Sequence, residues 1–519
     1  MSKSRSASFL VAAGILLSRV AGLVRQRVFA HYFGQSAAAD AFNAAFRIPN
    51  FLQNLFGEGV LSASFIPIYS RLLAGKDEKE AGRLAGAIAS IILLVVTSIV
   101  LVGVLLTPLL VSGIAPGFTG ERRDLTIQLT RIFFPGAGLL VLSAWCLGIL
   151  NSHRKFFLSY TAPVLWNVVM IGAMFWWGRH STQNALAVSL AWASVAGSAA
   201  QFLIQLPAVL RLVSKLDLGA NWKNGPVQTV LKNFLPVFIG RGVVQVSAFV
   251  DSMLASLLPL GAVSAISYAQ VLYTLPVSLF GMSVSAAELP EMSSVLGSNQ
   301  EVAEKLRTRL LRGLRQITFF ILPSIAAFLA LGDIIAAALF QTGKFTARDA
   351  DYVWLILAGS SVGMLASTRG RLYASVSYAL GDTTRPFYFS CWRVAISTLL
   401  GFIGVRFIPQ WLGIEARWGV LAITLAASIG AWIEFYLLRQ TIHQKIGLTL
   451  LPGNFTFKLV LLTIVASALA WGVKILLPLD WHPILRAGVI LPVFGFSYFS
   501  MAATFGIEEA RAIFRRFRR

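Results

Sequence analysis

The chain has 519 residues, of which 56% are hydrophobic and only 13% are charged. A soluble protein carries about 25% charged residues, so this composition excludes a soluble enzyme, a disordered scaffold and a nucleic-acid-binding domain. The net charge of +22 is typical of a membrane protein whose cytoplasmic loops collect Lys and Arg. The apolar residues form blocks of about 20 or more, long enough to cross a bilayer as helices.

These blocks predict an all-α polytopic membrane protein with about fourteen membrane-spanning helices. The approximate limits of the spans are 8–30, 37–70, 84–114, 125–151, 157–178, 184–212, 228–258, 262–294, 314–341, 350–379, 386–408, 416–440, 456–478 and 483–505. A polar connector from Arg211 to Lys232 separates spans 1–6 from spans 7–12, as in a two-lobed transporter built from repeats. We therefore expect an N-lobe, a cytoplasmic connector, a C-lobe and a C-terminal pair of spans with a basic tail, at residues 1–212, 213–227, 228–445 and 446–519.

Lys and Arg gather in every second loop and at both ends of the chain. With an even number of spans, this distribution predicts that both termini are cytoplasmic. Two basic pairs, Arg122 with Arg123 and Lys344 with Arg348, are exceptions that we place outside, each with acids nearby. We expect no removed signal peptide, because no small-residue cleavage site follows a short apolar core.

Span 2 carries a polar stripe at steps of three and four residues, which places its members on one helical face. The stripe consists of Asp40, Asn43, Arg47, Asn50, Asn54 and Glu58. Hydrogen bonds between helices are one interpretation, and we favour it for Asn43 or Asn54 alone. For the three ionisable groups we favour a hydrated cavity, because a charge buried in the bilayer costs about 2.5–3.5 kcal/mol.

Span 1 contains Arg19, Arg25 and Arg27 within its apolar segment. Arginine suits phosphate because its planar fork donates two hydrogen bonds and stays charged. We expect Arg19 and Arg25, together with Arg47, to hold a diphosphate, whereas Arg27 lies close to the end of the helix. An internal salt-bridge set with Asp40 and Glu58 is the alternative, and the two interpretations are compatible.

The second half carries further charges within its spans. Arg241 and Asp251 lie in span 7, and Arg393 and Glu434 lie in spans 11 and 12. Asp251 is a candidate for a cation or proton site, or else a hydrogen-bonded packing acid. No nucleophile, zinc-protease or P-loop motif is present, so we expect neither an enzyme nor a cofactor, and we assign no metal site.

The two last predicted spans, from Phe457 to Phe505, are mainly aliphatic and aromatic. Either they form a groove for an acyl or prenyl tail, or they are plain lipid-facing helices added to a twelve-span core.

Several motifs resemble one family of membrane transporters. SRVAGLVRQ and ADAFNAAFRIPNFLQNLFGEGVLSASFIPIYS, followed by LPEMS, LFQTGKFTARD and YALGDTTRPF, are similar in sequence and order to the MurJ (MviN) family of lipid II flippases. The resemblance covers essentially the whole chain. It implies the fold of the MOP exporter superfamily, with two pseudo-symmetric six-helix lobes, two additional C-terminal helices, a central cationic cavity and a lateral groove.

The resemblance also implies a function. A lipid II flippase moves an undecaprenyl-diphosphate-linked muropeptide from the inner to the outer leaflet of the bacterial cytoplasmic membrane by alternating access, for peptidoglycan synthesis. We expect a monomer that contacts membrane lipids and cell-wall synthesis proteins and binds no nucleic acid. The alternatives are an exporter of another lipid-linked oligosaccharide or of small drugs, and a non-transporting scaffold for envelope assembly.

The resemblance places Arg19, Arg25, Asp40, Arg47 and Glu58 where the family keeps functional polar residues, and we add Asn50 to this predicted site. The chain also departs from the family at several positions. An arginine is usual at Gln53, and a charged run is usual around Gln270, Val271 and Thr274. We hypothesise that Arg241 or Arg393 supplies compensating charge. Ser397 and Gly401 stand where a sodium site would have an asparagine and an acid, which argues against sodium coupling.

Overall fold

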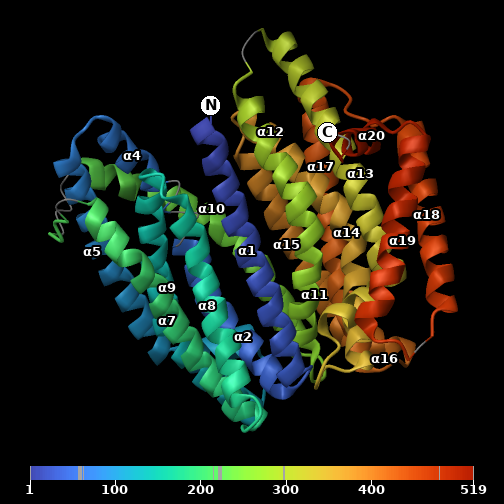
Figure 1. The fold of residues 1–519 in the computed structure, drawn as a ribbon, viewed down its shortest axis with the longest axis horizontal. Helices are drawn as coiled ribbons and strands as arrows, with labels where there is room; N and C mark the ends of the chain where they lie inside the picture. Colours follow the sequence, from blue (N-terminus) through green and yellow to red (C-terminus); the bar gives the residue numbers. More distant parts are fainter. Residues whose placement is uncertain are drawn as a thin grey trace. The chain divides into compact units, whose positions relative to one another are not determined.

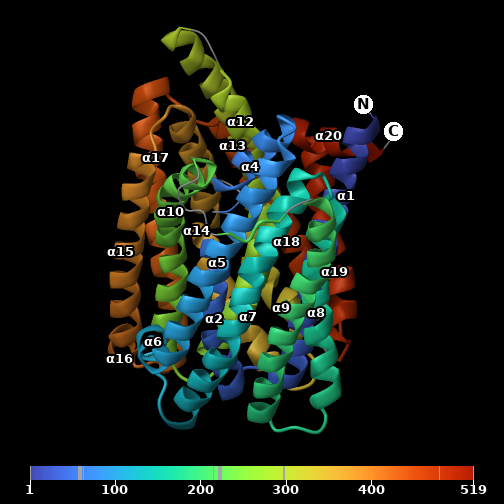
Figure 2. The same cartoon turned by 90° about the vertical axis from the view of Figure 1, so that its left-hand side faces the viewer.

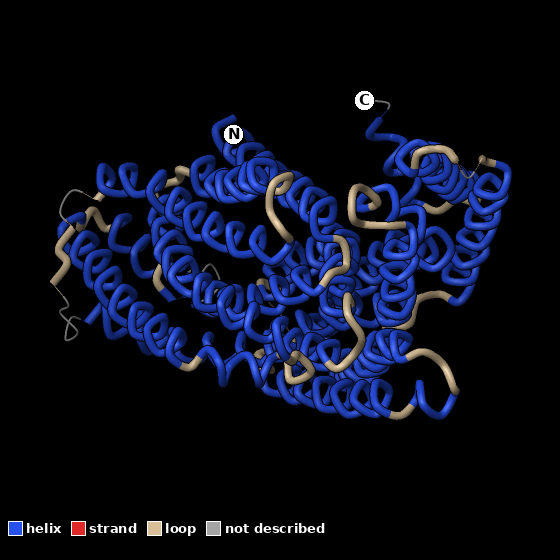
Figure 3. Tube along the Cα trace, turned by 90° about the horizontal axis from the view of Figure 1, so that it is seen from below, coloured by secondary structure: helices blue, strands red, loops and turns tan. Residues whose placement is uncertain are grey.

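The computed structural model describes residues 2–56, 61, 64–213, 216–219, 225–295, 298–478 and 480–517. Across these residues the chain is helical and contains no strand (Figure 3). One isolated bridge, between Thr342 and Phe345, occurs in a turn. Backbone contacts divide the chain into two compact units, unit 1 at Met1–Ser264 and unit 2 at Ala265–Arg519.

Unit 1 is built from nine helices of the described chain. They are α1 (Ser2–Phe33), α2 (Ala37–Phe56), α4 (Ile66–Ala74), α5 (Glu78–Leu105), α6 (Thr107–Ile114), α7 (Gly120–Ser152), α8 (Phe156–Trp177), α9 (Gln183–Leu212) and α10 (Gly225–Ser256). Helix α8 contacts both α1 and α9, and α7 contacts both α2 and α9. Figures 1 and 2 show α7, α8 and α9 running side by side. This packing fixes α1 and α2, the helices that carry the predicted site.

Unit 2 begins within α11 and ends with the C-terminal helix. Its elements are α11 (Ala262–Pro276), the π-helical segment η1 (Val277–Met282), α12 (Ser283–Ser293), α13 (Asn299–Phe340), α14 (Ala347–Ala379), α15 (Thr384–Arg406), α16 (Ile408–Leu412), the 3₁₀ turn η2 (Ala416–Trp418), α17 (Gly419–Ile446), α18 (Gly453–Leu476), α19 (Pro483–Thr504) and α20 (Glu508–Phe517). Helix α14 packs against α13 and α17, and α17 packs against α14 and α15.

Within the described residues, eleven helices are long and apolar enough to cross a membrane. The prediction of an all-α polytopic membrane protein is therefore confirmed. The number fourteen stays a prediction, because the three other predicted spans coincide with α1, α2 and α10, which are not among the eleven. Helices α1 and α2 carry the arginines and acids of the predicted site, which lower their apolar character.

The apolar core of unit 1 lies where α4, α5, α7 and α9 meet. Phe65, Leu84, Ile149 and Val209 are all fully buried there. Trp145 of α7 also lies in this core and donates its indole N–H to the carbonyl of Ala85 in α5 at 3.2 Å. Close packing of these side chains holds the four helices together through van der Waals contacts.

Helix α10 groups with unit 1, although we expected it to open the second lobe. It packs against α2, α5 and α6. Packing and repeat organisation are different properties of the chain, so the lobes at residues 1–212 and 228–445 stay a prediction.

The last two predicted spans, now α18 and α19, pack against each other and against α13 within unit 2. Tyr498 of α19 is buried and donates its hydroxyl to the carbonyl of Phe319 in α13 at 2.7 Å.

Helices α14 and α17 approach each other closely, since a Cβ on Gly363 would lie 2.6 Å from the Cα of Ser428. Glycine at this position lets the two backbones touch.

Candidate functional site

Arg25 is held between α1 and α8 by partners that carry no charge. Its Nε donates to the side-chain oxygen of Asn167 at 3.0 Å. Its guanidinium also lies 5.0 Å from the centre of the Trp166 ring, within the range of a cation–π contact. Among the described residues, its two Nη groups donate no hydrogen bond. Arg25 thus keeps its full positive charge and several unused donors.

Local structure in α8 orients both partners of Arg25. The amide nitrogen of Asn167 donates to the carbonyl of Pro163 at 3.0 Å, which turns the amide oxygen toward Arg25. The indole of Trp166 donates to the carbonyl of Ser194 in α9 at 3.1 Å. Gly197 permits this placement, since a Cβ there would lie 2.9 Å from the Trp166 ring. Arg25 is therefore preorganised by α8 and α9 rather than by its own helix.

Arg47 and Asp251 come together in unit 1, although we predicted separate roles for them. Both side chains are half-buried, and they interact electrostatically. A cation site at Asp251 would compete with this interaction. The described residues contain no group of three or more His, Cys, Asp or Glu side chains that could hold a metal ion.

Asp40 is fully buried, and the contacts of its carboxylate are to neighbouring parts of unit 1. One oxygen accepts from the backbone N–H of Ser264 at 2.8 Å, and the other accepts from that of Gly261 at 2.8 Å. These groups belong to the first turn of α11, whose N–H groups have no partner within the helix. Asp40 therefore caps α11 in the way that an N-cap side chain does.

Arg122 completes the arrangement around Asp40. Its Nη1 lies 3.6 Å from a carboxylate oxygen of Asp40, and its Nη2 donates to the carbonyl of Gly117 at 3.2 Å. Gly261 has φ +94° and would place a Cβ 3.0 Å from Gln35, so glycine is required for this turn. The acid that pairs with Arg122 is thus Asp40 of α2, and not an acid close to Arg122 in the sequence.

The other predicted site residues differ in how the structure places them. Arg19 and Asn50 are exposed. Glu58 lies outside the described residues, and so does the side chain of Arg241. Arg393 in α15 is paired with Glu434 of α17 at 3.0 Å, so its charge is balanced. Arg19, Arg25, Arg47, Asp40, Asn50 and Glu58 as a substrate site remain a prediction.

The structure reveals several side chains with specific contacts or charges that the sequence did not lead us to predict. Asn167 and Trp166 orient Arg25, and no pattern in the sequence pointed to these contacts. In unit 2, Arg369 donates through Nη2 to the hydroxyl of Thr318 at 2.7 Å. A systematic search for charges within apolar helices would have found Arg369 and its neighbour Arg371, because both lie inside α14.

The fold defined by these helices is that of the MOP transporter superfamily. A solved structure described as the inward-facing conformation of a multidrug resistance MATE family transporter of that superfamily superposes with a TM-score of 0.65 at 17% identity, covering 82% of this chain and 95% of the other. A closer fold likeness is to "Lipid II flippase MurJ, inward closed conformation", with a TM-score of 0.77 at 23% identity, covering 96% and 98% of the two chains.

Within that class, the chain belongs to the MurJ family. The family profile described as "Lipid II flippase MurJ" matches residues 29–489. "Lipid II flippase MurJ" of Burkholderia cenocepacia is 29% identical over 513 residues, covering 95% of this chain and 96% of the relative. "Probable lipid II flippase MurJ" of Bdellovibrio bacteriovorus is 30% identical over 444 residues, covering 84% and 81%. The resemblance read from the opening motifs is confirmed, and the chain is a multi-pass membrane protein of a transporter family.

Proposed function

We propose that this protein flips lipid II, the undecaprenyl-diphosphate-linked muropeptide, from the inner to the outer leaflet of the bacterial cytoplasmic membrane. Membership of the MurJ family over residues 29–489 carries this proposal. In it the chain is not an enzyme, both termini are cytoplasmic, and transport proceeds by alternating access. The excess of Lys and Arg in alternate loops supports this orientation.

In this proposal Arg25 is the principal group that binds the diphosphate. Its described partners are neutral, so its positive charge is available to an anion. Arg19 and Asn50 are exposed on α1 and α2 and extend the binding surface, while Arg47 acts together with Asp251. Asp40 is a positioning residue, because its described contacts hold the start of α11.

Complementation tests the proposal directly. The gene is expressed in a bacterium from which the resident lipid II flippase is depleted, and growth is measured together with the amount of protein in the membrane. We expect the wild-type chain to restore growth and Arg25→Ala to abolish it. Arg71→Ala, which removes an exposed arginine of α4, is the matched control and retains growth. Growth without Arg25 at normal protein levels contradicts the assigned role.

An exporter of another lipid-linked oligosaccharide is the second candidate. Gln53 stands where the resemblance leads us to expect an arginine, and the amide of Gln270 donates to the hydroxyl of Thr274 at 3.2 Å where charges are usual. A cargo with fewer negative charges needs fewer arginines. In this case the wild-type chain reaches the membrane without restoring growth. Restoring a charge with Gln53→Arg then distinguishes an altered cargo from a non-transporting scaffold, which no charge substitution would convert into a flippase.

A further inference from the structure

Helix α13 is longer than a membrane is thick. Its 42 residues extend about 63 Å at 1.5 Å per residue, against about 30 Å of hydrocarbon. Residues 316–340 contain a single charged side chain, Asp333, whereas residues 299–315 contain five basic and two acidic side chains. The first turns of α13 thus project beyond the apolar part of the helix, to the depth of lipid headgroups.

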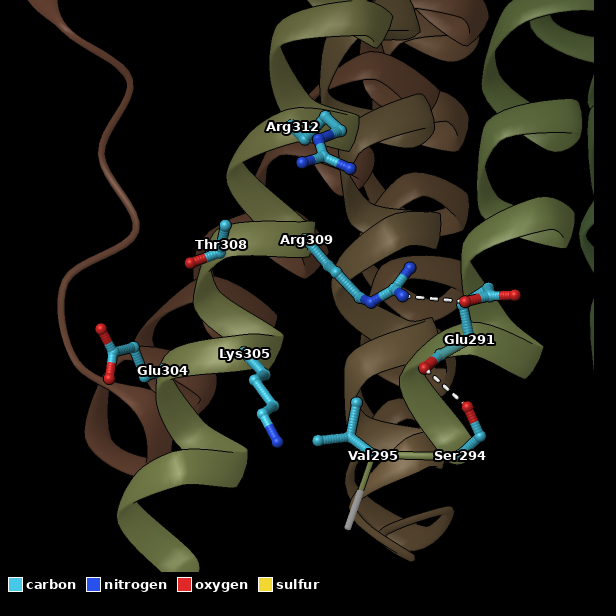
Figure 4. A pocket seen from close by; sticks show the side chains of 8 residues that line it. All are labelled: Glu291, Ser294, Val295, Glu304, Lys305, Thr308, Arg309 and Arg312. Carbon is cyan, nitrogen blue, oxygen red and sulfur yellow. Dashed lines mark hydrogen bonds and ion pairs between the residues drawn. The ribbon is translucent and has the colours of Figure 1, made fainter. Parts of the chain in front are cut away.

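A pocket of about 630 Å³ lies at this projecting end, between α13 and the end of α12. Lys305, Arg309 and Arg312 line it at steps of four and three residues, which places them on one face of α13. Figure 4 shows the three basic side chains on α13; Glu304 and Thr308, which also line the pocket, extend from the other side of that helix. We call this space the α12–α13 pocket.

Arg309 links α13 to α12 within the α12–α13 pocket. Its Nη1 lies 3.4 Å from a carboxylate oxygen of Glu288, and its Nη2 lies 2.8 Å from one of Glu291. Two carboxylates therefore surround the middle cation and fasten α12 to α13. Lys305 and Arg312 lie one turn to either side, and both are exposed. Arg312 makes no hydrogen bond or ion pair with any residue that the structure describes.

We propose that the α12–α13 pocket binds the phosphate of an anionic lipid headgroup, with Lys305 and Arg312 as its ligands. Basic side chains near a membrane surface attract anionic headgroups, and the arginine fork matches a phosphate. The pocket is larger than a bare ion requires, which suits a headgroup. An anionic glycerophospholipid and a polyprenyl diphosphate share this chemistry. The proposal does not depend on the transported cargo, because Arg25 and α1 take no part in it.

Lipid binding to the purified full-length protein tests the proposal. Native mass spectrometry measures dissociation constants for phosphatidylglycerol and for undecaprenyl diphosphate, with zwitterionic phosphatidylcholine as the reference lipid. We expect Lys305→Gln/Arg312→Gln to weaken binding of at least one anionic lipid about tenfold or more, since two charge contacts are lost. The lipid whose binding weakens identifies the source of the headgroup.

The matched control is Arg307→Gln/Arg348→Gln, which removes two exposed cations that do not line the pocket. It removes the same net charge, and we expect its dissociation constants to stay within about twofold of wild type. Equal weakening by both double variants overturns the proposal, because it shows a general charge effect. Unchanged binding in the pocket variant also overturns it.

A folding control accompanies these measurements. Thermal unfolding of each variant shows whether α12 and α13 remain packed, and Arg312→Gln alone replaces the double variant if the latter does not fold. Arg312→Lys keeps the charge and should recover most of the affinity lost in Arg312→Gln. Failure of this binding experiment leaves the complementation test of Arg25 unaffected, so the two proposals can be refuted separately.

Discussion

Arg25 in unit 1 and Arg393 in unit 2 both lie in spans predicted from the sequence, but their partners differ. Arg25 donates to the amide oxygen of Asn167 and lies over an indole ring. Arg393 donates to the carboxylate of Glu434 at 3.0 Å, and the same carboxylate accepts from Ser390 at 2.6 Å. A neutral partner fixes the direction of a guanidinium and leaves its charge, whereas a carboxylate cancels it. The comparison separates an arginine suited to bind an anion from one that holds helices together.

Unit 1 uses charged partners as well, so the difference lies between sites rather than between halves of the chain. Asp40 is engaged with Arg122 and with the start of α11. Arg47 interacts with Asp251. Of the two half-buried arginines assigned to the diphosphate, Arg25 is therefore the one whose described partners include no acid.

The largest effect should come from Arg25→Ala. A charge-assisted hydrogen bond contributes about 1.5–3 kcal/mol, so losing one or two such bonds to a phosphate should weaken cargo binding about 100-fold. We expect Arg25→Ala to abolish transport of a fluorescent lipid II analogue in proteoliposomes, with the thermal midpoint of unfolding nearly unchanged. Transport at the wild-type rate would show that an arginine with neutral partners is not, for that reason, a group that binds the cargo.

Asn167→Asp should have the next largest effect. It gives Arg25 an acidic partner of nearly the same shape, as Glu434 is for Arg393, and so cancels the charge of the guanidinium. We expect about tenfold weaker cargo binding and equal or higher thermal stability. Asn167→Ser, which stays neutral, is the control and should lose less affinity. Equal losses in the two variants would show that the geometry at Arg25 matters and its net charge does not.

Glu434→Gln tests whether the ion pair of Arg393 with Glu434 stabilises the folded protein. It leaves Arg393 without its counter-charge, and because the arginine is 33% exposed the cost should be about 1–2 kcal/mol rather than that of a fully buried pair. Chemical denaturation measures it. The double variant Arg393→Gln/Glu434→Gln should be more stable than Glu434→Gln alone. A double variant that is less stable than both single variants would contradict a simple charge pair.

The smallest effect concerns Asp382, in the loop between α14 and α15. Its carboxylate accepts from Lys445 at 2.8 Å and from the backbone N–H of Arg385 at 3.2 Å, and these contacts lower the pKa of Asp382 below its usual value. Because the folded pKa is the lower one, the stabilisation is complete above the unfolded pKa near 3.9 and disappears as the pH falls through the folded pKa.

Asp382→Asn should therefore cost about 0.5 kcal/mol at neutral pH, the size expected of an ion pair near the surface. The difference from wild type should shrink below about pH 4. Unfolding midpoints measured between pH 3 and pH 7 check this. A difference that is constant over the whole range would show that the carboxylate charge is not involved.

Much of the fold was predictable because its signal is local. Helices that must satisfy their own hydrogen bonds in lipid appear as apolar blocks in the sequence. Eleven such helices were found in the described residues, and α18 and α19 match the two last predicted spans within a few residues. Pairings between distant residues carried no such signal. Nothing in the sequence indicated that α10 would group with unit 1, since helix contacts depend on shape.

The candidate site was predictable in its residue types and less so in its contacts. The periodicity of span 2 placed Asp40 and Arg47 on one face of a helix. It did not show that Asp40 reaches the backbone of Gly261, 221 residues away, or that Arg47 meets Asp251. Such partners belong to other helices, and a helical period describes only the helix that carries it.

The sequence by itself determined that this chain spans a membrane as helices, that it belongs to the MurJ family, and which arginines lie in its predicted spans, because hydropathy and motif spacing are properties of consecutive residues. Only the tertiary structure decided which of those arginines meets a neutral partner and which meets an acidic one. That outcome depends on the side chain brought within hydrogen-bonding distance, an amide for Arg25 and a carboxylate for Arg393. The packing of α1 on α8 and of α15 on α17 determines which partner each arginine meets.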